Sequence, residues 1–285
     1  TTAHGGARPS HAAWQGRQFH RGGAVDYMGK HYPDFEAATG YGTGAGLCGW
    51  NCRHTFFSIF PELGPAPAWT QSDLEALNAR DIEYNGGRYT QYEISQMQRA
   101  RERTVRKYKR RYLAEDAAGA DTTASAVKLR QARQELADFI SATGGRADSA
   151  RTSVAGFGRS ASSKAAWAAK KQEWLDAVNN DLTTLRESGK IRMTGTAVIP
   201  PALPNTLNFE GHSLEQMAKR QISLAQANEI AEHAILAVRQ RNGTQHSYYS
   251  DKGFIVIKQD GSIGTVGWLD DGGKQIVEVM KKHGF

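Results

Sequence analysis

Residues 88–112, RYTQYEISQMQRARERTVRKYKRRY, have the pattern of a long helix. Apolar side chains recur along this stretch at heptad-like spacing, with Arg101 at one position of the seam. A second periodic run follows a break at residues 119–122, where Asp121 or Thr122 would cap its start. The apolar positions are Ile94, Met97, Val105, Tyr108 and Tyr112 in the first run and Leu129, Ala132, Leu136 and Phe139 in the second. The two runs predict an antiparallel helical hairpin.

The chain before the hairpin is of a different kind. Residues 1–68 are rich in Gly, His and aromatic side chains and lack helical periodicity. Prolines Pro61, Pro65 and Pro67 close this block. Its glycine run 40–46 lacks the Gly-Lys-Ser/Thr ending of a nucleotide-binding loop, so we expect an ordinary loop there. Its small core is expected from Trp14, Tyr32, Phe35, Tyr41, Trp50, Phe56 and Phe57.

After the hairpin a third helix is predicted over 163–188. Its apolar face carries Trp167, Leu175, Val178, Leu182 and Leu185. Three prolines between residues 200 and 204 then exclude a helix and predict a stiff linker over 196–207.

Residues 208–285 predict a small α+β unit. We expect helices over 213–220 and 223–241, three short strands near 246–249, 254–258 and 263–268, and a last helix over 273–282. The whole chain is therefore predicted to be α+β, with an irregular block at 1–68, a helical region at 69–195, the linker, and a C-terminal domain with a three- to four-stranded antiparallel sheet.

The bulk composition limits the class of protein. Hydrophobic residues make up 39% of the 285 residues and charged residues 23%, which is enough to build packed cores. The formal net charge of +7 favours a polyanionic neighbour. Two cysteines are too few for a disulfide-stapled secreted fold, and no apolar run is long enough to span a bilayer, so no membrane partner is expected. Because Thr1 is not a start methionine, we expect further chain upstream.

Several motifs of the first block occur in a characteristic order. They are Ala3-His4-Gly5-Gly6-Ala7-Arg8-Pro9-Ser10-His11, Trp14-Gln15-Gly16, Tyr32-Pro33-Asp34-Phe35, Thr39-Gly40-Tyr41-Gly42 and Gly46-Leu47-Cys48-Gly49-Trp50-Asn51-Cys52-Arg53-His54. This series resembles the phage minor capsid protein 2 family, a relative of the Mu-type head morphogenesis proteins, over roughly residues 1–160. The resemblance implies a structural component of the virion, assembled in the host cytoplasm, whose partners are portal and capsid proteins and packaged DNA.

The same block supplies candidate metal ligands. His11, Cys48, Cys52 and His54 could form a zinc tetrahedron that holds the glycine-rich loops. His4 is the alternative to Cys48 as the fourth ligand. Against a zinc site, the spacing of the two cysteines is wider than in common zinc knuckles. The alternative is two small cysteines and hydrogen-bonded histidines without a metal.

The first hairpin helix is strongly basic. Arg99, Arg103, Arg106, Lys107 and Arg110 are its candidate nucleic-acid ligands. Packaged DNA could neutralise them through its phosphates, without readout of bases. The alternative is a solvated helix face, or pairing with nearby acids.

Three stretches of the last block are Gly211-His212-Ser213-Leu214-Glu215-Gln216-Met217, Arg220-Gln221-Ile222-Ser223 and the hairpin from Tyr248-Tyr249 to Gly253. They resemble, more weakly, the nuclease-like domains of the barnase/EndoU/colicin/RelE-like superfamily that are appended to phage head proteins. Metal-independent RNA cleavage needs a base, an acid and a cation at the phosphate. His212 as acid or base, Arg220 on the phosphate, and His246 or Tyr248 as the other proton carrier are the candidates, with RNA as substrate and a cognate immunity protein as partner.

Three hypotheses for the function result. The first is a phage head structural protein that carries a ribonuclease-like domain. The second is a toxin ribonuclease delivered by a phage structural module. The third is a non-specific nucleic-acid-binding protein built on the hairpin.

Overall fold

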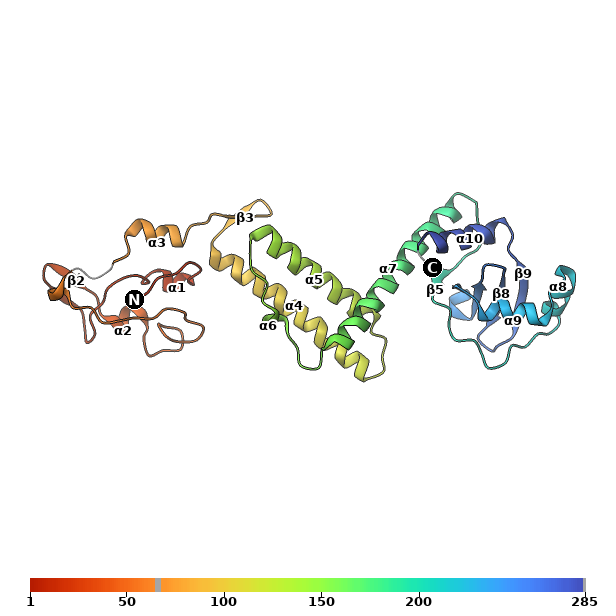
Figure 1. Ribbon diagram of the computed structural model, residues 1–285, viewed down its shortest axis with the longest axis horizontal. Helices are drawn as coiled ribbons and strands as arrows, with labels where there is room; N and C mark the ends of the chain where they lie inside the picture. Colours follow the sequence, from red (N-terminus) through yellow and green to blue (C-terminus); the bar gives the residue numbers. More distant parts are fainter. Residues whose placement is uncertain (65–67, 284–285) are drawn as a thin grey trace. The chain divides into compact units, whose positions relative to one another are not determined.

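The computed structural model describes residues 1–64 and 68–283, which form two compact units (Figure 1). One unit comprises Thr1–Ala120 and Lys128–Ala161, and the other comprises Asp121–Val127 and Ser162–Phe285. Helices and antiparallel sheets occur together, which confirms the predicted α+β class. No helix among the described residues is both long and apolar enough to be a membrane span. Of the prolines predicted to close the first block, Pro65 and Pro67 lie outside the described residues.

The N-terminal block contains little regular structure. Its elements are α1 (Pro9–Ala12), the hairpin β1 (Val25–Tyr27) and β2 (Lys30–Tyr32), α2 (Phe35–Thr39) and the short 3-10 helix η1 (Pro61–Leu63). Among its described residues, the apolar cluster has three buried members, Trp14, Phe35 and Leu47. Elsewhere in the block Tyr32 is buried as predicted. So small a core leaves most of the block to be held by hydrogen bonds and polar side chains.

Three aromatic residues expected in that core are exposed. Phe56 and Phe57 line the surface, although the Phe56 ring still contacts Phe35 at 4.9 Å between centroids. Trp50 is 78% exposed. Its ring covers the backbone of Gly44, where a side chain would come within 3.0 Å of it, instead of entering the apolar cluster.

The predicted helical hairpin is present. After α3 (Gln71–Leu77) and a second β-hairpin of β3 (Ile82–Tyr84) and β4 (Gly87–Tyr89), the chain forms α4 (Gln91–Ala117) and α5 (Thr123–Thr143), which lie side by side (Figure 1). Thr90 and Glu93 cap the start of α4 reciprocally. The guanidinium of Arg101 lies 4.1 Å from the Phe139 ring centroid, so the cation at the seam position packs on an aromatic face of α5.

Two polar residues complete the buried seam of α4. Gln98 and Glu102 are buried between the expected apolar positions. The Gln98 amide donates to Glu102 Oε1 at 2.9 Å and to the carbonyl of Arg146 at 2.9 Å. Heptad counting missed them because it assigns polar residues to the solvent side, whereas here the segment that carries α6 (Ser149–Thr152) covers that face.

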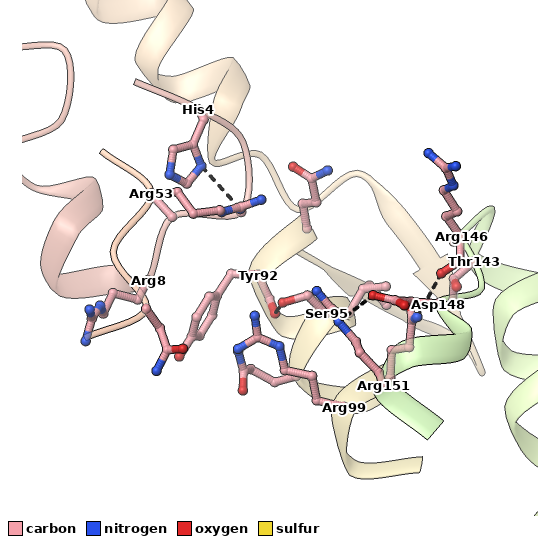
Figure 2. A pocket seen from close by; sticks show the side chains of 18 of the residues that line it. His4, Arg8, Arg53, Tyr92, Ser95, Arg99, Thr143, Arg146, Asp148 and Arg151 are labelled. Carbon is pink, nitrogen blue, oxygen red and sulfur yellow. Dashed lines mark hydrogen bonds and ion pairs between the residues drawn. The ribbon is translucent and has the colours of Figure 1, made fainter. Parts of the chain in front are cut away.

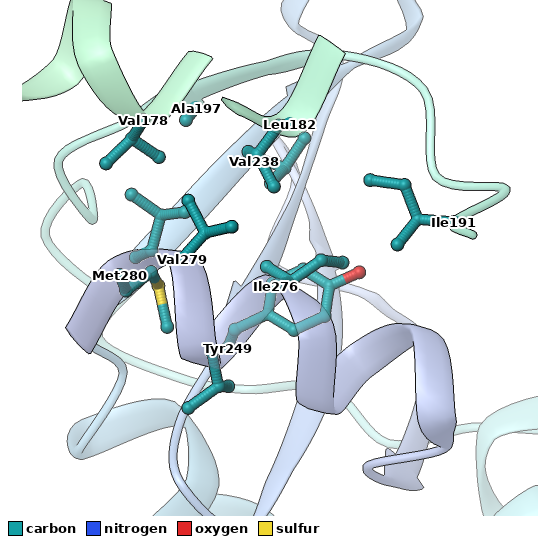
Figure 3. Packing of buried hydrophobic residues seen from close by; sticks show 11 residues of the cluster. Val178, Leu182, Ile191, Ala197, Val238, Tyr249, Ile276, Val279 and Met280 are labelled. Atoms are coloured by element: carbon teal, nitrogen blue, oxygen red, sulfur yellow. The ribbon is translucent and has the colours of Figure 1, made fainter. Parts of the chain in front are cut away.

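The second unit is built on a five-stranded antiparallel sheet. Its strands follow in chain order: β5 (Thr196–Val198), β6 (Leu236–Gln240), β7 (Gln245–Tyr249), β8 (Gly253–Lys258) and β9 (Ile263–Trp268). Helices α7 (Arg159–Glu187) and α10 (Asp271–Lys282) contribute the apolar side chains on one face, where Val178, Leu182 and Met280 pack with Val238 and Tyr249 (Figure 3). Helices α8 (His212–Arg220) and α9 (Leu224–Glu232) cover the other face through Met217 and Ile230. The sheet therefore lies between two helical layers.

The prediction of a helix over 223–241 was wrong in its second half. Helix α9 ends at Glu232, and Leu236–Gln240 is the strand β6. Strand β6 pairs with β5 on one side and with β7 on the other. Leu236, Ala237 and Val238 are all completely buried because both faces of this strand are covered. Such a continuous apolar run has no period-2 signature, so it was mistaken for helix.

The sheet also extends into the predicted linker. Residues 196–198 form the edge strand β5, and Asn179 on α7 bonds both the N–H and the carbonyl of Ala197. This gives five strands where three to four were expected. The compact units divide near residue 161, whereas the predicted linker is at 196–207. On α7, Trp167 is 66% exposed and does not join the apolar face assigned to it.

Candidate metal centre

Three of the predicted ligand residues converge on one point in the N-terminal block. Helix α1 supplies His11, and the loop after α2 supplies Cys52 and His54. The Nδ1 atoms of the two histidines are 3.4 Å apart. The Cys52 Sγ lies 3.7 Å from Nδ1 of His11 and 3.6 Å from Nδ1 of His54. Both histidines are buried and Cys52 is half-buried, so this cluster could hold a metal ion.

The far nitrogen of each ring determines its tautomer. Nε2 of His11 lies 2.9 Å from the carbonyl oxygen of Ala45, which can only accept a hydrogen bond. Nε2 of His54 lies 3.0 Å from Oε1 of Gln15, and this oxygen also accepts from the backbone N–H of His4 at 3.1 Å. Both Nε2 atoms therefore carry the proton and donate. In the neutral rings, both Nδ1 lone pairs point into the cluster.

The rings are held in the neutral form. Burial, with the nearby His4, His11, Arg53 and Arg8, lowers the pKa of His54 to about 4. Burial also lowers the pKa of His11, against the opposing effect of its bond to Ala45. Two lone pairs thus face each other, and the thiol of Cys52 is the nearest group that could donate to either. A cation at their centre would satisfy all three atoms at once.

The distances match a tetrahedral zinc ion. Zinc binds imidazole nitrogen at about 2.0–2.1 Å and thiolate at about 2.3 Å, so tetrahedral ligands would be about 3.3 Å apart for two nitrogens and about 3.6 Å for nitrogen and sulfur. The three separations in the cluster agree with these values within 0.2 Å. The hydrogen bonds from Nε2 to Ala45 and Gln15 are also the outer contacts that orient metal-binding histidines.

The fourth predicted ligand lies apart from the other three. Cys48 is exposed, has a left-handed backbone with φ of 60°, and directs its Sγ to the carbonyl of His54 at 3.7 Å. The alternative ligand, His4, stacks on the His54 ring at 4.2 Å between centroids. Its Nε2 is buried and has no hydrogen-bond partner among the described residues. The structure thus brings together His11, Cys52 and His54 and leaves the choice between His4 and Cys48 open.

The glycine run serves the cluster through its backbone. A side chain on Gly46 would collide with the backbone of Gly40, which has φ of 63°, so the two ends of the run are in direct contact. This close approach positions the intervening carbonyl of Ala45 at His11. The side chain of Gln15, which is completely buried, provides the corresponding hydrogen-bond acceptor for His54. Gln15 was missed as a site residue because a single glutamine in a sequence gives no sign of its burial.

The predicted nucleic-acid ligands on α4 occupy different surroundings. Arg103, Lys107 and Arg110 are exposed. The guanidinium of Arg106 instead donates to the carbonyl of Arg151 in the α6 segment. Arg99 is half-buried and lines a cavity.

The predicted ribonuclease residues are spread over the second unit. His212 is exposed at the start of α8. Arg220 donates to Thr265 Oγ1 at 3.2 Å and to the carbonyl of Val266, both on β9. His246 and Tyr248 lie on β7, two strands from β9, with ring centroids 6.3 Å apart. Tyr248 is buried, and its hydroxyl is 3.5 Å from the Pro201 carbonyl. The ribonuclease interpretation of these residues stays a prediction.

A comparison with protein families addresses the segment that contains the metal cluster. Residues 1–141 match the family model of phage minor capsid protein 2. The match includes the His/Cys cluster, α4 and most of α5, and it supports a structural protein of a phage head. It ends before the five-stranded sheet, and nothing in the comparisons supports a nuclease-like domain at 208–285. No curated protein and no solved structure matches the chain.

Proposed function

We propose that this chain is a minor structural protein of a phage head, near the portal and the packaged DNA, whose N-terminal block is held in shape by a zinc ion. The observation that carries the proposal is the convergence of His11, Cys52 and His54 inside the segment that matches the minor capsid protein 2 family. The zinc in this proposal is structural: it joins α1 to residues 52–54 in a block whose buried apolar cluster is small.

The small size of the N-terminal core gives the proposed zinc its energetic role. With three residues in its buried apolar cluster, the block gains little from the hydrophobic effect to offset the entropy of its glycines. A structural zinc site contributes apparent binding free energies of about 10–16 kcal/mol in small zinc-finger peptides. An ion that joins α1 to residues 52–54 would therefore contribute much of the stability of the block.

Elemental analysis of the purified full chain tests the metal. We expect close to one zinc per chain, and loss of this zinc in Cys52→Ser and His54→Ala. His31→Ala is the matched control, because His31 is an exposed histidine of the same block that contacts only Asp26 among the described residues. Full zinc content in Cys52→Ser and His54→Ala would rule out the site.

The fourth ligand can be assigned in the same measurement. Cys48→Ser and His4→Ala each remove one alternative. If zinc binding weakens in only one of these variants, the residue replaced in that variant is the fourth ligand. If zinc binding is unchanged in both, water completes the tetrahedron.

The role in the head needs a test on particles. Mass spectrometry of purified phage particles is expected to find the chain at low copy number, together with portal and capsid proteins. Its absence from particles that are otherwise complete would contradict the role, whatever the metal content of the isolated chain.

A further inference from the structure

A cavity lined by arginines opens in the first unit, beside the metal cluster. It has a volume of about 920 Å³. Its walls come from the segment around Arg8, the loop around Arg53, the start of α4 and the segment that carries α6 (Figure 2). Tyr92 and Ser95 of α4 also line it.

The cavity concentrates positive charge. Its charged lining residues are the arginines Arg8, Arg53, Arg99, Arg146 and Arg151 and a single acid, Asp148. Five arginines against one aspartate leave a formal charge of +4. Asp148 is paired with Arg151 at 3.2 Å, so the other arginines depend on neutral partners or solvent.

The neutral partners of these arginines leave donors free. Arg8 donates from one nitrogen to the carbonyl of Trp50 at 2.7 Å. Among the described residues, Arg53 makes only long hydrogen bonds, at 3.4 Å to Nδ1 of His4 and 3.5 Å to the carbonyl of Gly5. For the half-buried guanidinium of Arg99, the structure has no hydrogen bond to another described residue. Each guanidinium has five N–H groups, so most donors of these arginines remain available.

We propose that this cavity binds phosphate groups of a nucleic acid backbone. Arginine forks match phosphate oxygens bidentately, and hydroxyl side chains such as those of Tyr92 and Ser95 are common additional phosphate ligands. The cations come from separate segments around a space much larger than one phosphate group. A ligand that carries several linked phosphates would neutralise them together, without contacts to bases.

The site differs from the basic face of α4. Of the residues predicted on that face, only Arg99 lines the cavity, whereas Arg8, Arg53 and Arg151 were not among the candidates. The proposed site is also independent of the role in a phage head, because it follows from the charge and geometry of this unit alone.

The test measures affinity of the full chain for a duplex DNA oligonucleotide, a single-stranded oligonucleotide and inorganic phosphate at several salt concentrations. We expect Arg99→Gln and Arg53→Gln each to weaken DNA binding about 10-fold. Each should also reduce the slope of log K against log salt by about 0.9 for duplex DNA. Arg110→Gln and Arg17→Gln are the matched controls, since both side chains are exposed and lie outside the cavity.

Two further results are needed for the interpretation. If each variant unfolds at the same temperature as the parent chain, its weaker DNA binding comes from a lost contact with the DNA and not from a loss of folded structure. Stronger binding of either oligonucleotide than of phosphate supports the proposal. Equal losses with Arg99→Gln and Arg110→Gln would place the contact along the helix and overturn it, as would unaffected DNA binding in both cavity variants. Binding of inorganic phosphate but of neither oligonucleotide would overturn the nucleic acid assignment.

Discussion

Gln15 accepts a hydrogen bond from Nε2 of His54 at 3.0 Å while being completely buried itself. The same Oε1 atom accepts from the backbone N–H of His4, and the amide nitrogen of Gln15 is 3.4 Å from Asn78 Oδ1. One side chain therefore orients a candidate metal ligand and links it to two other segments.

Replacement of Gln15 should weaken the metal site without removing a ligand. In Gln15→Leu, His54 loses the acceptor that fixes its tautomer, and we expect zinc affinity to fall about 10- to 100-fold. Competition with a chromophoric chelator measures this. Gln18→Leu, which among the described residues removes only the hydrogen bond from Lys30, is the control and should bind zinc normally. Equal affinities for the two variants would show that Gln15 does not support the site.

The buried pair on α4 gives a stability prediction. Gln98→Leu removes the amide that satisfies Glu102, so we expect a loss of about 1–3 kcal/mol in the free energy of unfolding. Addition of Glu102→Leu should recover part of this loss, because no buried carboxylate then lacks a partner. Denaturant unfolding measures both. The exposed pair Gln134 and Asp138 is the matched control, and Gln134→Leu should change stability by less than about 0.5 kcal/mol. Similar losses from both glutamines would argue against the burial of this pair.

Variants at Arg220 and His212 distinguish a structural role of these residues from the predicted ribonuclease role. Because the Arg220 side chain bonds to β9, we expect Arg220→Ala to lower the melting temperature, whereas His212→Ala, at an exposed position, should leave it unchanged. Differential scanning fluorimetry measures this. Arg220→Ala with normal stability would contradict the structural role. RNA cleavage by the chain that His212→Ala abolishes would instead support the ribonuclease interpretation.

Asp181 links α7 to the end of the chain and predicts an acid sensitivity. Its carboxylate accepts from Lys282 at 2.7 Å and from His283 at 3.0 Å, and these hydrogen bonds hold its pKa below the usual value. Because the folded pKa is depressed, the stabilisation is fully present above the unfolded pKa of about 3.9 and is lost as the pH falls through the folded value.

The melting temperature of Asp181→Asn should therefore lie slightly below that of the parent chain at pH 7, and the difference should vanish near pH 2. A partly exposed ion pair contributes about 0.2–1 kcal/mol to the free energy of unfolding, so the expected difference is small. Asp176→Asn, an exposed aspartate of α7 that accepts only from Gln172 among the described residues, should show no such pH dependence. A difference that persists unchanged into acid would contradict the assignment.

Local sequence alone was sufficient for the features that depend on neighbours within one or two turns. The heptad spacing of Ile94, Val105 and Tyr112 predicted α4, because a helix repeats its inward face every three to four residues. The kinds of side chain needed for a metal site were also visible, since Cys and His are chemically distinctive wherever they lie.

Tertiary structure decided which of these residues act together. His11 is more than forty positions from Cys52 and His54, and only the folded loops bring their nitrogen and sulfur atoms within bonding distance of one ion. The same holds for Arg53 and Arg99 around the cavity, and for Leu236–Gln240, which became a central strand because β5 and β7 pair with it. The physical reason is common to all three: burial and long-range pairing depend on what lies opposite a residue, which its own neighbours in the sequence do not specify.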